Sequence, residues 1–245
     1  MTDSATVRLT VVSDTMCPWC YIGKRRLEKA LALVPDVPVA VSWRPFQLDA
    51  TIPQDGMDRH TYLIRKFGAG GAVRVYARIE EAGRQEGIPF AFERIARSPN
   101  TIDSHRLLHW AEAADVQDAM AERLFALFFT EGADIGNRDV LAQAAHDCGM
   151  DGAAVRARLD TDDAKSLVYR QIADVQEVGI DGVPCFVVNG STYLPGAQPP
   201  DVIAHAILSA AAQASQFAAR PSRGSPAAIS RFACSKSIRS PKTRL

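Results

Sequence analysis

The feature that most constrains this chain is a pair of cysteines placed between a strand pattern and a helix pattern. The sequence Cys17-Pro18-Trp19-Cys20 follows the apolar run 7–12 after four residues and comes just before an amphipathic stretch at 22–34. Proline is tolerated at the first helical position, where its missing N–H costs no hydrogen bond. The spacing therefore predicts a strand that leads into a helix whose first turn carries both cysteines.

The start of a helix gives the two thiols a defined chemistry. Unpaired backbone N–H groups and the positive end of the helix dipole favour a thiolate over a thiol. A thiolate attacks disulfides, and a second thiol three residues on can resolve the mixed disulfide that forms. A zinc site needs two further ligands at matched spacing, but Cys148, Cys185 and Cys234 each stand alone. We therefore expect no metal, and we predict thiol–disulfide exchange at Cys17 and Cys20.

The order of elements along the chain is typical of an α/β fold that is interrupted by helices. Alternating apolar residues at 37–43 predict a second strand after the first helix. Two further β runs, 185–188 and 191–194, flank Asn189-Gly190, which is the strongest local signal for a hairpin. Helical patterns cover the ranges 60–67, 73–86, 102–115, 118–129, 138–148, 162–178 and 200–214. The predicted order is βαβ, then a helical block, then αββα.

These patterns divide the chain into one domain and a tail. We expect a domain at 1–213, with halves at about 1–50 and 161–213 and a helical insertion at about 51–160. The stretch 214–245 has no periodicity and is expected to be disordered. The last 26 residues carry seven Lys and Arg and no Asp or Glu, which leaves 21 basic against 28 acidic residues in the rest. An acidic body argues against nucleic acid as a partner of the domain.

Composition also bears on the compartment. The longest apolar stretches are far too short to span a membrane, so no membrane partner is expected. Residues 1–6 have neither the basic region nor the apolar core of a secretory signal. We therefore predict a cytoplasmic protein, in which structural disulfides are rare and the cysteine pair cycles between its oxidised and reduced forms. Nothing in the sequence predicts an oligomeric state.

Several motifs together resemble the DsbA superfamily of thiol–disulfide oxidoreductases, and within it the FrnE-like branch. The resemblance extends from about Val7 to Ala212 and implies a thioredoxin-like fold with a large α-helical insertion. Its motifs are far more specific together than a lone Cys-x-x-Cys. They are Asp14-Thr15-Met16-Cys17-Pro18-Trp19-Cys20-Tyr21-Ile22-Gly23, Trp43-Arg44-Pro45-Phe46-Gln47-Leu48, Gly179-Ile180-Asp181-Gly182-Val183-Pro184 and Tyr193-Leu194-Pro195-Gly196-Ala197-Gln198-Pro199-Pro200.

The resemblance implies roles for individual residues. Cys17 would be the attacking thiol, accessible at the helix start, and Cys20 the buried resolving thiol. Val183-Pro184 would be a cis peptide bond facing the cysteine pair, and the backbone before Pro184 would pair with an extended substrate. Trp19, Val183, Pro184 and His105 are accordingly expected to contact substrate, with His105 lining the cleft. We also expect the helical insertion to pack beside the cysteines as a cap.

The resemblance leaves several alternatives open. Kappa-type glutathione transferases and 2-hydroxychromene-2-carboxylate isomerases look similar in topology, but they generally have Ser in place of Cys17 and lack a functional second Cys. A non-catalytic partner-binding module is a third possibility, because a fold does not fix a function. We favour a disulfide oxidoreductase or isomerase that acts on disulfide-containing proteins or small disulfides. It would bind no cofactor, with glutathione as a possible redox partner. Cys185 is open to two interpretations, a core residue or a third thiol near the site.

Overall fold

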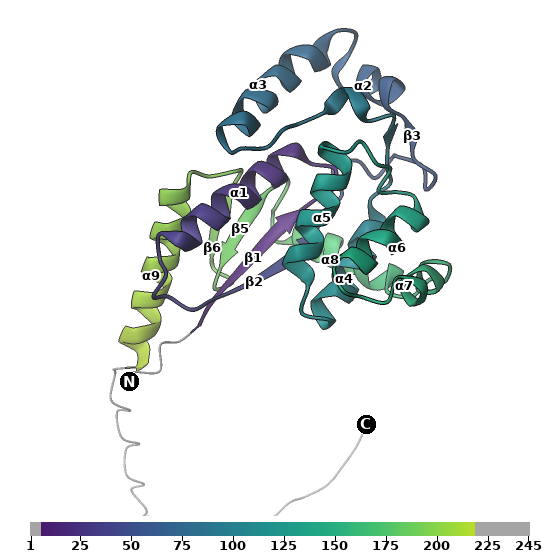
Figure 1. The fold of residues 1–245 in the computed structure, drawn as a ribbon. Coiled ribbons are helices and arrows are strands. Elements are labelled where there is room, and N and C mark those ends of the chain that lie inside the picture. Colours follow the sequence, from purple (N-terminus) through teal and green to yellow (C-terminus); the bar gives the residue numbers. More distant parts are fainter. Residues whose placement is uncertain (1–5, 219–245) are drawn as a thin grey trace, which may run out of the picture.

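A four-stranded mixed sheet forms the centre of the domain, and its strands come from the two ends of the described chain (Figure 1). The computed structural model describes residues 6–218. The strands are β1 (Val7–Ser13), β2 (Val39–Pro45), β5 (Cys185–Val188) and β6 (Thr192–Pro195), in the order β2-β1-β5-β6. Strand β1 runs parallel to β2 and antiparallel to β5. This order confirms the predicted α/β class.

Alternation along the strands sends side chains to two different helical layers. Leu9 and Val11 of β1 join the main core, into which α1 (Pro18–Ala32) and α9 (Pro200–Ala218) also pack. Val12 of β1 belongs to a separate small cluster, against which Val175 of α8 (Lys165–Glu177) packs. The active-site helix α1 and helix α8 therefore cover opposite faces of the sheet.

The hairpin between β5 and β6 forms where the Asn-Gly pair predicts it. Asn189 and Gly190 have φ values of 48° and 72°, and the strands on either side pair from Val188 to Thr192 outward. Both turn positions need a positive φ, which glycine adopts without strain and asparagine tolerates. The local sequence thus determines the register of the β5–β6 hairpin, whose first strand directly follows Pro184.

The segment between the two halves is helical, as predicted. It contains α2 (Arg59–Phe67), α3 (Gly71–Gln85), α4 (Ile102–Ala113), α5 (Gln117–Phe129), α6 (Arg138–Asp147) and α7 (Gly152–Leu159). The sequence patterns predicted the first five of these within about three residues at each end. Helix α7 was not predicted, because its eight residues bury only Val155 and Leu159 and show no apolar stripe.

A second, two-stranded sheet inside the insertion is also absent from the sequence prediction. Strands β3 (Met57–Asp58) and β4 (Arg97–Ser98) pair antiparallel. A short 3₁₀ turn at Phe92–Arg94 precedes β4. The insertion expected at about 51–160 is therefore not purely helical. Two-residue strands are too short to produce a detectable period of two.

Aromatic rings hold the active-site helix against the insertion. Tyr21 of α1 stacks on Phe125 of α5 with ring centroids 5.2 Å apart, and it contacts Phe129 at 6.2 Å. Phe90 meets Tyr21 edge-on at 6.1 Å. Such aromatic pairs contribute about 0.5–1.5 kcal/mol each beyond the area they bury. The first turns of α1 are thereby held in a fixed position relative to the insertion.

The far end of the domain differs slightly from the predicted boundary. Helix α9 continues to Ala218, so the tail boundary expected at 214 falls inside this helix. The disorder expected beyond that helix lies outside the described residues. Within residues 6–218, no helix is both long enough and apolar enough to cross a membrane.

Candidate active site

Cys17 occupies the N-cap position of α1. Its backbone is extended, with φ −92° and ψ 113°, and its carbonyl accepts from the amide of Cys20 at 3.0 Å. Its side chain makes no capping hydrogen bond, so the sulfur is left free for other partners. Pro18 follows at the first helical position, as predicted. The thiol therefore lies beside the unpaired N–H groups of the first helical turn, where negative charge is favoured.

The Cys17 sulfur is covered by its neighbours. The residue is 3 % exposed, and its Sγ donates to the carbonyl of Val183 at 3.6 Å. The expectation that Cys17 is accessible is therefore wrong for this conformation. The helix start alone would leave the sulfur open, but the loop before β5 lies against it and side chains of the insertion pack into the same core. A disulfide substrate has to displace part of this cover.

Cys20 lies one turn into the helix and is completely buried. Burial, together with the hydrogen bond and the charge of neighbouring Cys17, raises the pKa of the Cys20 thiol well above its ordinary value. The side chain of Ser13 and the backbone of Asp14 act in the opposite direction. Both cysteines are free thiols in this structure. Shielded inside the helix, Cys20 keeps its proton until a reaction at Cys17 changes its surroundings.

The buried thiol makes the stability of the reduced protein depend on pH. In the unfolded chain Cys20 ionises near pH 8.5, whereas its raised pKa keeps it protonated in the fold. The contribution of Cys20 to the free energy of unfolding is fully present below about pH 8.5. Above that pH it falls by at most about 1.4 kcal/mol per pH unit. We expect the free energy of unfolding to fall less steeply with pH in Cys20→Ala than in the wild type. The measurement is urea unfolding of the reduced proteins from pH 7 to 10. Identical pH dependence in the two proteins would contradict the burial of this thiol.

Pro184 packs directly on the active-site helix. The peptide bond Val183–Pro184 is cis, and Pro184 is buried. A Cβ atom built on Gly23 would lie 2.9 Å from the Pro184 ring and 3.3 Å from the Phe186 ring. The absence of a side chain at Gly23 is therefore what allows α1 to approach the loop before β5. This approach places the Val183 carbonyl beside Cys17.

Replacing Gly23 with alanine is expected to destabilise the fold by about 1–3 kcal/mol, the usual cost of overpacking. The gain in helix propensity of up to about 1 kcal/mol offsets only part of this cost. Gly182→Ala is the matched control, since its added Cβ meets nothing within 4 Å and its φ is not left-handed. Chemical unfolding of both variants should show a loss for Gly23→Ala alone. Equal stability of the two variants would show that the loop moves freely away from α1.

His105 does not line a cleft. Its side chain is 1 % exposed, and its Nε2 lies 2.9 Å from the carbonyl of Phe46 and 3.5 Å from Asp14 Oδ1. Asp14 is fully buried and accepts from the amide of Leu48 at 2.7 Å. The prediction that His105 contacts substrate is therefore wrong. Instead, the Asp14–His105 pair fixes the chain after β2 to the end of β1, directly before the cysteines.

The structure settles the two interpretations of Cys185. Its register partner on β1 is Val12, and both residues belong to the small cluster on the α8 face, together with Phe46. The next residue, Phe186, faces α1 instead. Cys185 is thus a core residue on the side of the sheet away from Cys17. Its pKa is raised by burial, as expected for an inert thiol.

Helix α3 packs on α1, whose first turn carries the cysteines, and α2 packs on α3, as predicted for a cap (Figure 1). Arg59 at the start of α2 is 7 % exposed and donates to Tyr76 of α3 at 2.5 Å and to Ser98 at 3.2 Å. Among the described residues no carboxylate pairs with Arg59. Burial raises the pKa of the Tyr76 phenol, and a negative charge on Cys17 raises it further. The cap is therefore anchored through a buried arginine, and its tyrosine lies within electrostatic range of Cys17.

Trp19, the third residue of the cysteine motif, is half-buried between α1 and α3. It lines an open hollow of about 490 Å³. The residues that share this hollow are Arg74, Val75, Arg78 and Ile79. Trp19 was predicted from the cysteine motif, whereas none of the α3 residues was predicted. The sequence does contain a signal for the α3 residues, because Arg74 and Arg78 are four residues apart on one predicted helix.

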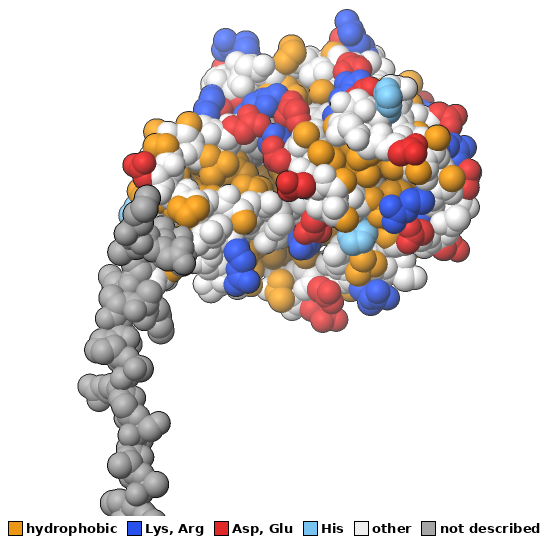
Figure 2. Space-filling view, turned by 60° about the horizontal axis from the view of Figure 1, so that its bottom comes forward, with side chains coloured by type: hydrophobic (Ala, Val, Ile, Leu, Met, Phe, Trp, Pro, Cys, Tyr) orange, Lys and Arg blue, Asp and Glu red, His pale blue; other side chains and the backbone are white. Residues whose placement is uncertain are grey.

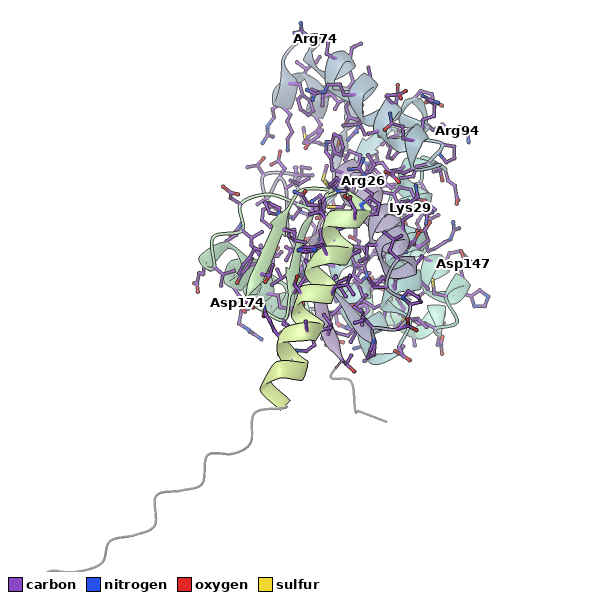
Figure 3. All side chains as sticks on the ribbon, turned by 90° about the vertical axis from the view of Figure 1, so that its left-hand side faces the viewer. Arg26, Lys29, Arg74, Arg94, Asp147 and Asp174 are labelled. Atoms are coloured by element: carbon purple, nitrogen blue, oxygen red, sulfur yellow. The ribbon has the colours of Figure 1, made fainter. Side chains whose placement is uncertain are left out.

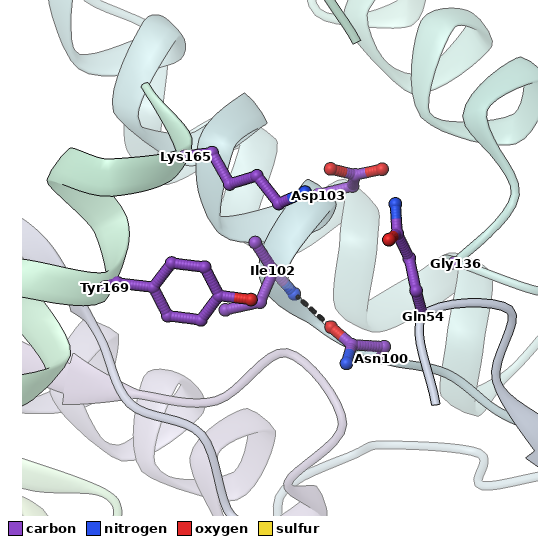
Figure 4. Close-up of a pocket in the computed structure, with 7 residues that line it drawn as sticks. All are labelled: Gln54, Asn100, Ile102, Asp103, Gly136, Lys165 and Tyr169. Atoms are coloured by element: carbon purple, nitrogen blue, oxygen red, sulfur yellow. Dashed lines mark hydrogen bonds between the residues drawn. The ribbon is translucent and has the colours of Figure 1, made fainter. Parts of the chain in front are cut away.

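A small pocket on the other side of the insertion is unrelated to the cysteines. Its volume is about 30 Å³, enough for a single water, and Asn100 Oδ1 accepts from the amide of Ile102 inside it (Figure 4). The residues that line it are Gln54, Asn100, Ile102, Asp103, Gly136, Lys165 and Tyr169. In the part of the chain that the structure describes, no three His, Cys, Asp or Glu side chains are grouped to hold a metal ion.

The surface carries charges of both signs. On the face drawn in Figure 2, Lys and Arg side chains are interspersed with Asp and Glu. Many of the basic residues are neutralised locally; Arg26 and Lys29 of α1, for example, both bind Glu86. This face therefore lacks the single-sign basic stripe that nucleic-acid binding uses.

Comparisons with known proteins agree with this geometry. The sequence pattern of the DSBA-like thioredoxin domain matches residues 8–208. The uncharacterized protein YwbO of Bacillus subtilis is 28 % identical over 203 residues, which cover 82 % of this chain and 96 % of YwbO. The crystal structure of a probable DsbA oxidoreductase from Streptomyces coelicolor superimposes with a TM-score of 0.77 at 28 % identity, covering 90 % of this chain and 94 % of the other.

A more distant similarity concerns the fold alone. The structure of a 2-hydroxychromene-2-carboxylate isomerase superimposes with a TM-score of 0.63 at 17 % identity, covering 86 % of this chain and 98 % of the isomerase. Together the comparisons confirm the predicted thioredoxin-like fold with its helical insertion.

Proposed function

This chain belongs to the family of DSBA-like thioredoxin domains, and on that premise we propose that it is a thiol–disulfide oxidoreductase that works through Cys17 and Cys20. The observation that carries the proposal is the pair of free thiols in the first turn of α1, one at the N-cap and one buried. This arrangement supplies an attacking sulfur and a resolving sulfur, which disulfide exchange needs.

The proposed reaction has two steps. The Cys17 thiolate attacks one sulfur of a substrate disulfide, a mixed disulfide forms, and the other substrate sulfur leaves as a thiolate that takes up a proton. Cys20 then loses its proton and attacks the Cys17 sulfur, which releases the second substrate thiol. The substrate gains two electrons and two protons, and the protein is left with a Cys17–Cys20 disulfide. A small thiol such as glutathione could restore the dithiol, with its own oxidation to a disulfide.

The backbone beside Cys17 gives the substrate a place to bind. The Val183 carbonyl lies 3.6 Å from the Cys17 sulfur, in the loop two residues before β5. An extended peptide that displaces this contact could pair with the backbone of Val183 by strand addition, so that its own sulfur would lie near Cys17. Disulfide-containing proteins are therefore the proposed substrates. A cytoplasmic location belongs to the same proposal.

Two assays run side by side test the proposal against its alternatives. Reduction of insulin by a small thiol should accelerate in the presence of the protein, while conjugation of glutathione to an electrophile should not. The reverse result would support a kappa-type transferase, whose fold is similar. Activity in neither assay would favour a partner-binding module.

A further inference from the structure

The open hollow beside Trp19 has a definite chemical pattern. Helix α3 contributes two pairs of side chains, and the two members of each pair are one helical turn apart. Val75 and Ile79 form an apolar row, and Arg74 and Arg78 form a basic row. Ile79 is 3 % exposed, so the apolar row is continuous with the core, whereas both arginines are exposed. Residues four apart on a helix lie on one side, so each row presents a single kind of surface.

The side chains of the two arginines are unpaired within residues 6–218. Neither the Arg74 nor the Arg78 guanidinium takes part in a hydrogen bond or an ion pair there. Two carboxylates of this region are committed to other partners, since Glu81 binds Arg84 and Glu86 binds Arg26 and Lys29 of α1. Glu80 of α3 forms no ion pair with either arginine among the described residues. Figure 3 shows Arg74 at the outer edge of the cap, well apart from Arg26 and Lys29. The hollow therefore carries uncompensated positive charge.

We propose that this hollow binds a polypeptide substrate in extended form whose reactive cysteine is flanked by acidic side chains at alternate positions. The inference rests on the proposed thiol–disulfide function and adds the class of substrate. Trp19 lines the hollow and is two residues from Cys17, so a polypeptide bound at Cys17 can extend into it. Guanidinium groups prefer carboxylates, with which they form paired hydrogen bonds.

The spacing of the arginines favours a peptide over a small molecule. Arg74 and Arg78 are one turn apart, a rise of about 6 Å along the helix. Alternate side chains of an extended chain lie on one side and are about 6.6 Å apart. Two acidic residues at positions i and i+2 can therefore meet both arginines at once, while the apolar row and Trp19 contact the chain between them. Pairing of the same chain with Val183 requires this extended form.

The test uses two disulfide-linked peptides that differ only in the residues flanking the cysteine, two aspartates in one and two lysines in the other. Their kcat/KM for reduction by the full-length protein is compared in the wild type, Arg74→Gln, Arg78→Gln and the double variant. Arg170→Gln is the matched control, because Arg170 is also exposed and unpartnered but lies on α8, on the opposite face of the sheet. Hydroxyethyl disulfide, which is neutral, reports the chemistry at the cysteines.

The wild type should prefer the aspartate peptide. Each arginine substitution should lower kcat/KM for that peptide about two- to five-fold, mainly through KM, as expected for exposed ion pairs. Hydroxyethyl disulfide should be unaffected, and the lysine peptide should be reduced somewhat faster, because each substitution removes a like charge that repels it. Arg170→Gln should change none of these rates. The preference should fade between about 0.01 M and 1 M salt, where the screening length falls from about 30 Å to 3 Å.

Three outcomes would overturn the inference. Equal rates for the two peptides, with hydroxyethyl disulfide still reduced, would refute the substrate class and leave the proposed function standing. If the arginine substitutions lowered kcat/KM for glutathione disulfide but for neither peptide, the hollow would be assigned to a small anionic disulfide instead. Failure to reduce any disulfide would refute the proposed function itself, and the inference with it.

Discussion

Cys17→Ser is expected to reduce disulfide exchange to the uncatalysed background. Cys17 is the N-cap residue of α1, and its sulfur lies beside the backbone that would hold a substrate. A serine hydroxyl ionises far less readily than a thiol and is a poor attacking group for a disulfide, so no mixed disulfide can form. The measurement is insulin reduction by the purified variant at equal concentration.

Cys148→Ser provides the control for this substitution. Cys148 is the half-buried C-cap residue of α6, outside the active-site helix α1. Its variant should retain full activity, and Cys17→Ser should unfold at nearly the same denaturant concentration as the wild type. Substantial activity in a folded Cys17→Ser protein would mean that another group performs the attack.

Cys20→Ser is expected to separate the two steps of the reaction. The attacking thiol remains, so the variant should still form a mixed disulfide with its substrate, but the resolving sulfur is gone. Turnover should stop after about one equivalent of mixed disulfide per molecule. Denaturing electrophoresis without reductant, followed by mass spectrometry, should show adducts on Cys17.

The comparison between the two variants assigns the roles. Adducts should accumulate with Cys20→Ser and be absent from Cys17→Ser and from the double variant. Adducts found only with Cys17→Ser would reverse the roles. Proteins trapped from a cell extract by Cys20→Ser should also carry acidic residues near the linked cysteine, if the hollow beside Trp19 selects them.

Local signals in the sequence sufficed for the features of the fold that depend on neighbouring residues. The Asn189-Gly190 turn fixes the β5–β6 hairpin because only a few residue types tolerate positive φ at both positions. Pro18 begins α1 as its ring geometry predicts. The burial of Cys20 follows from its place one turn into a helix that packs on a sheet.

Features that depend on distant parts of the chain could not be predicted in this way. Cys17 is covered because the loop before β5, more than 160 residues away, lies against its sulfur. His105 is buried because the Phe46 carbonyl and Asp14 need a partner, and helical periodicity carries no information about either. The net negative charge of the domain also gave no indication of the unpaired Arg74 and Arg78 of α3. A net charge does not distinguish these two arginines from the other basic side chains, most of which form ion pairs.

The central claim is that Cys17 and Cys20 form one redox couple. The most direct test equilibrates the protein in glutathione buffers of increasing oxidised fraction, quenches with acid, alkylates the free thiols and maps the disulfides by mass spectrometry. We predict a reversible Cys17–Cys20 disulfide whose fraction follows the buffer, with Cys148 and Cys185 alkylated throughout. If Cys17 and Cys20 stayed reduced in the most oxidising buffer, or formed disulfides only with other cysteines, the proposed function would be contradicted.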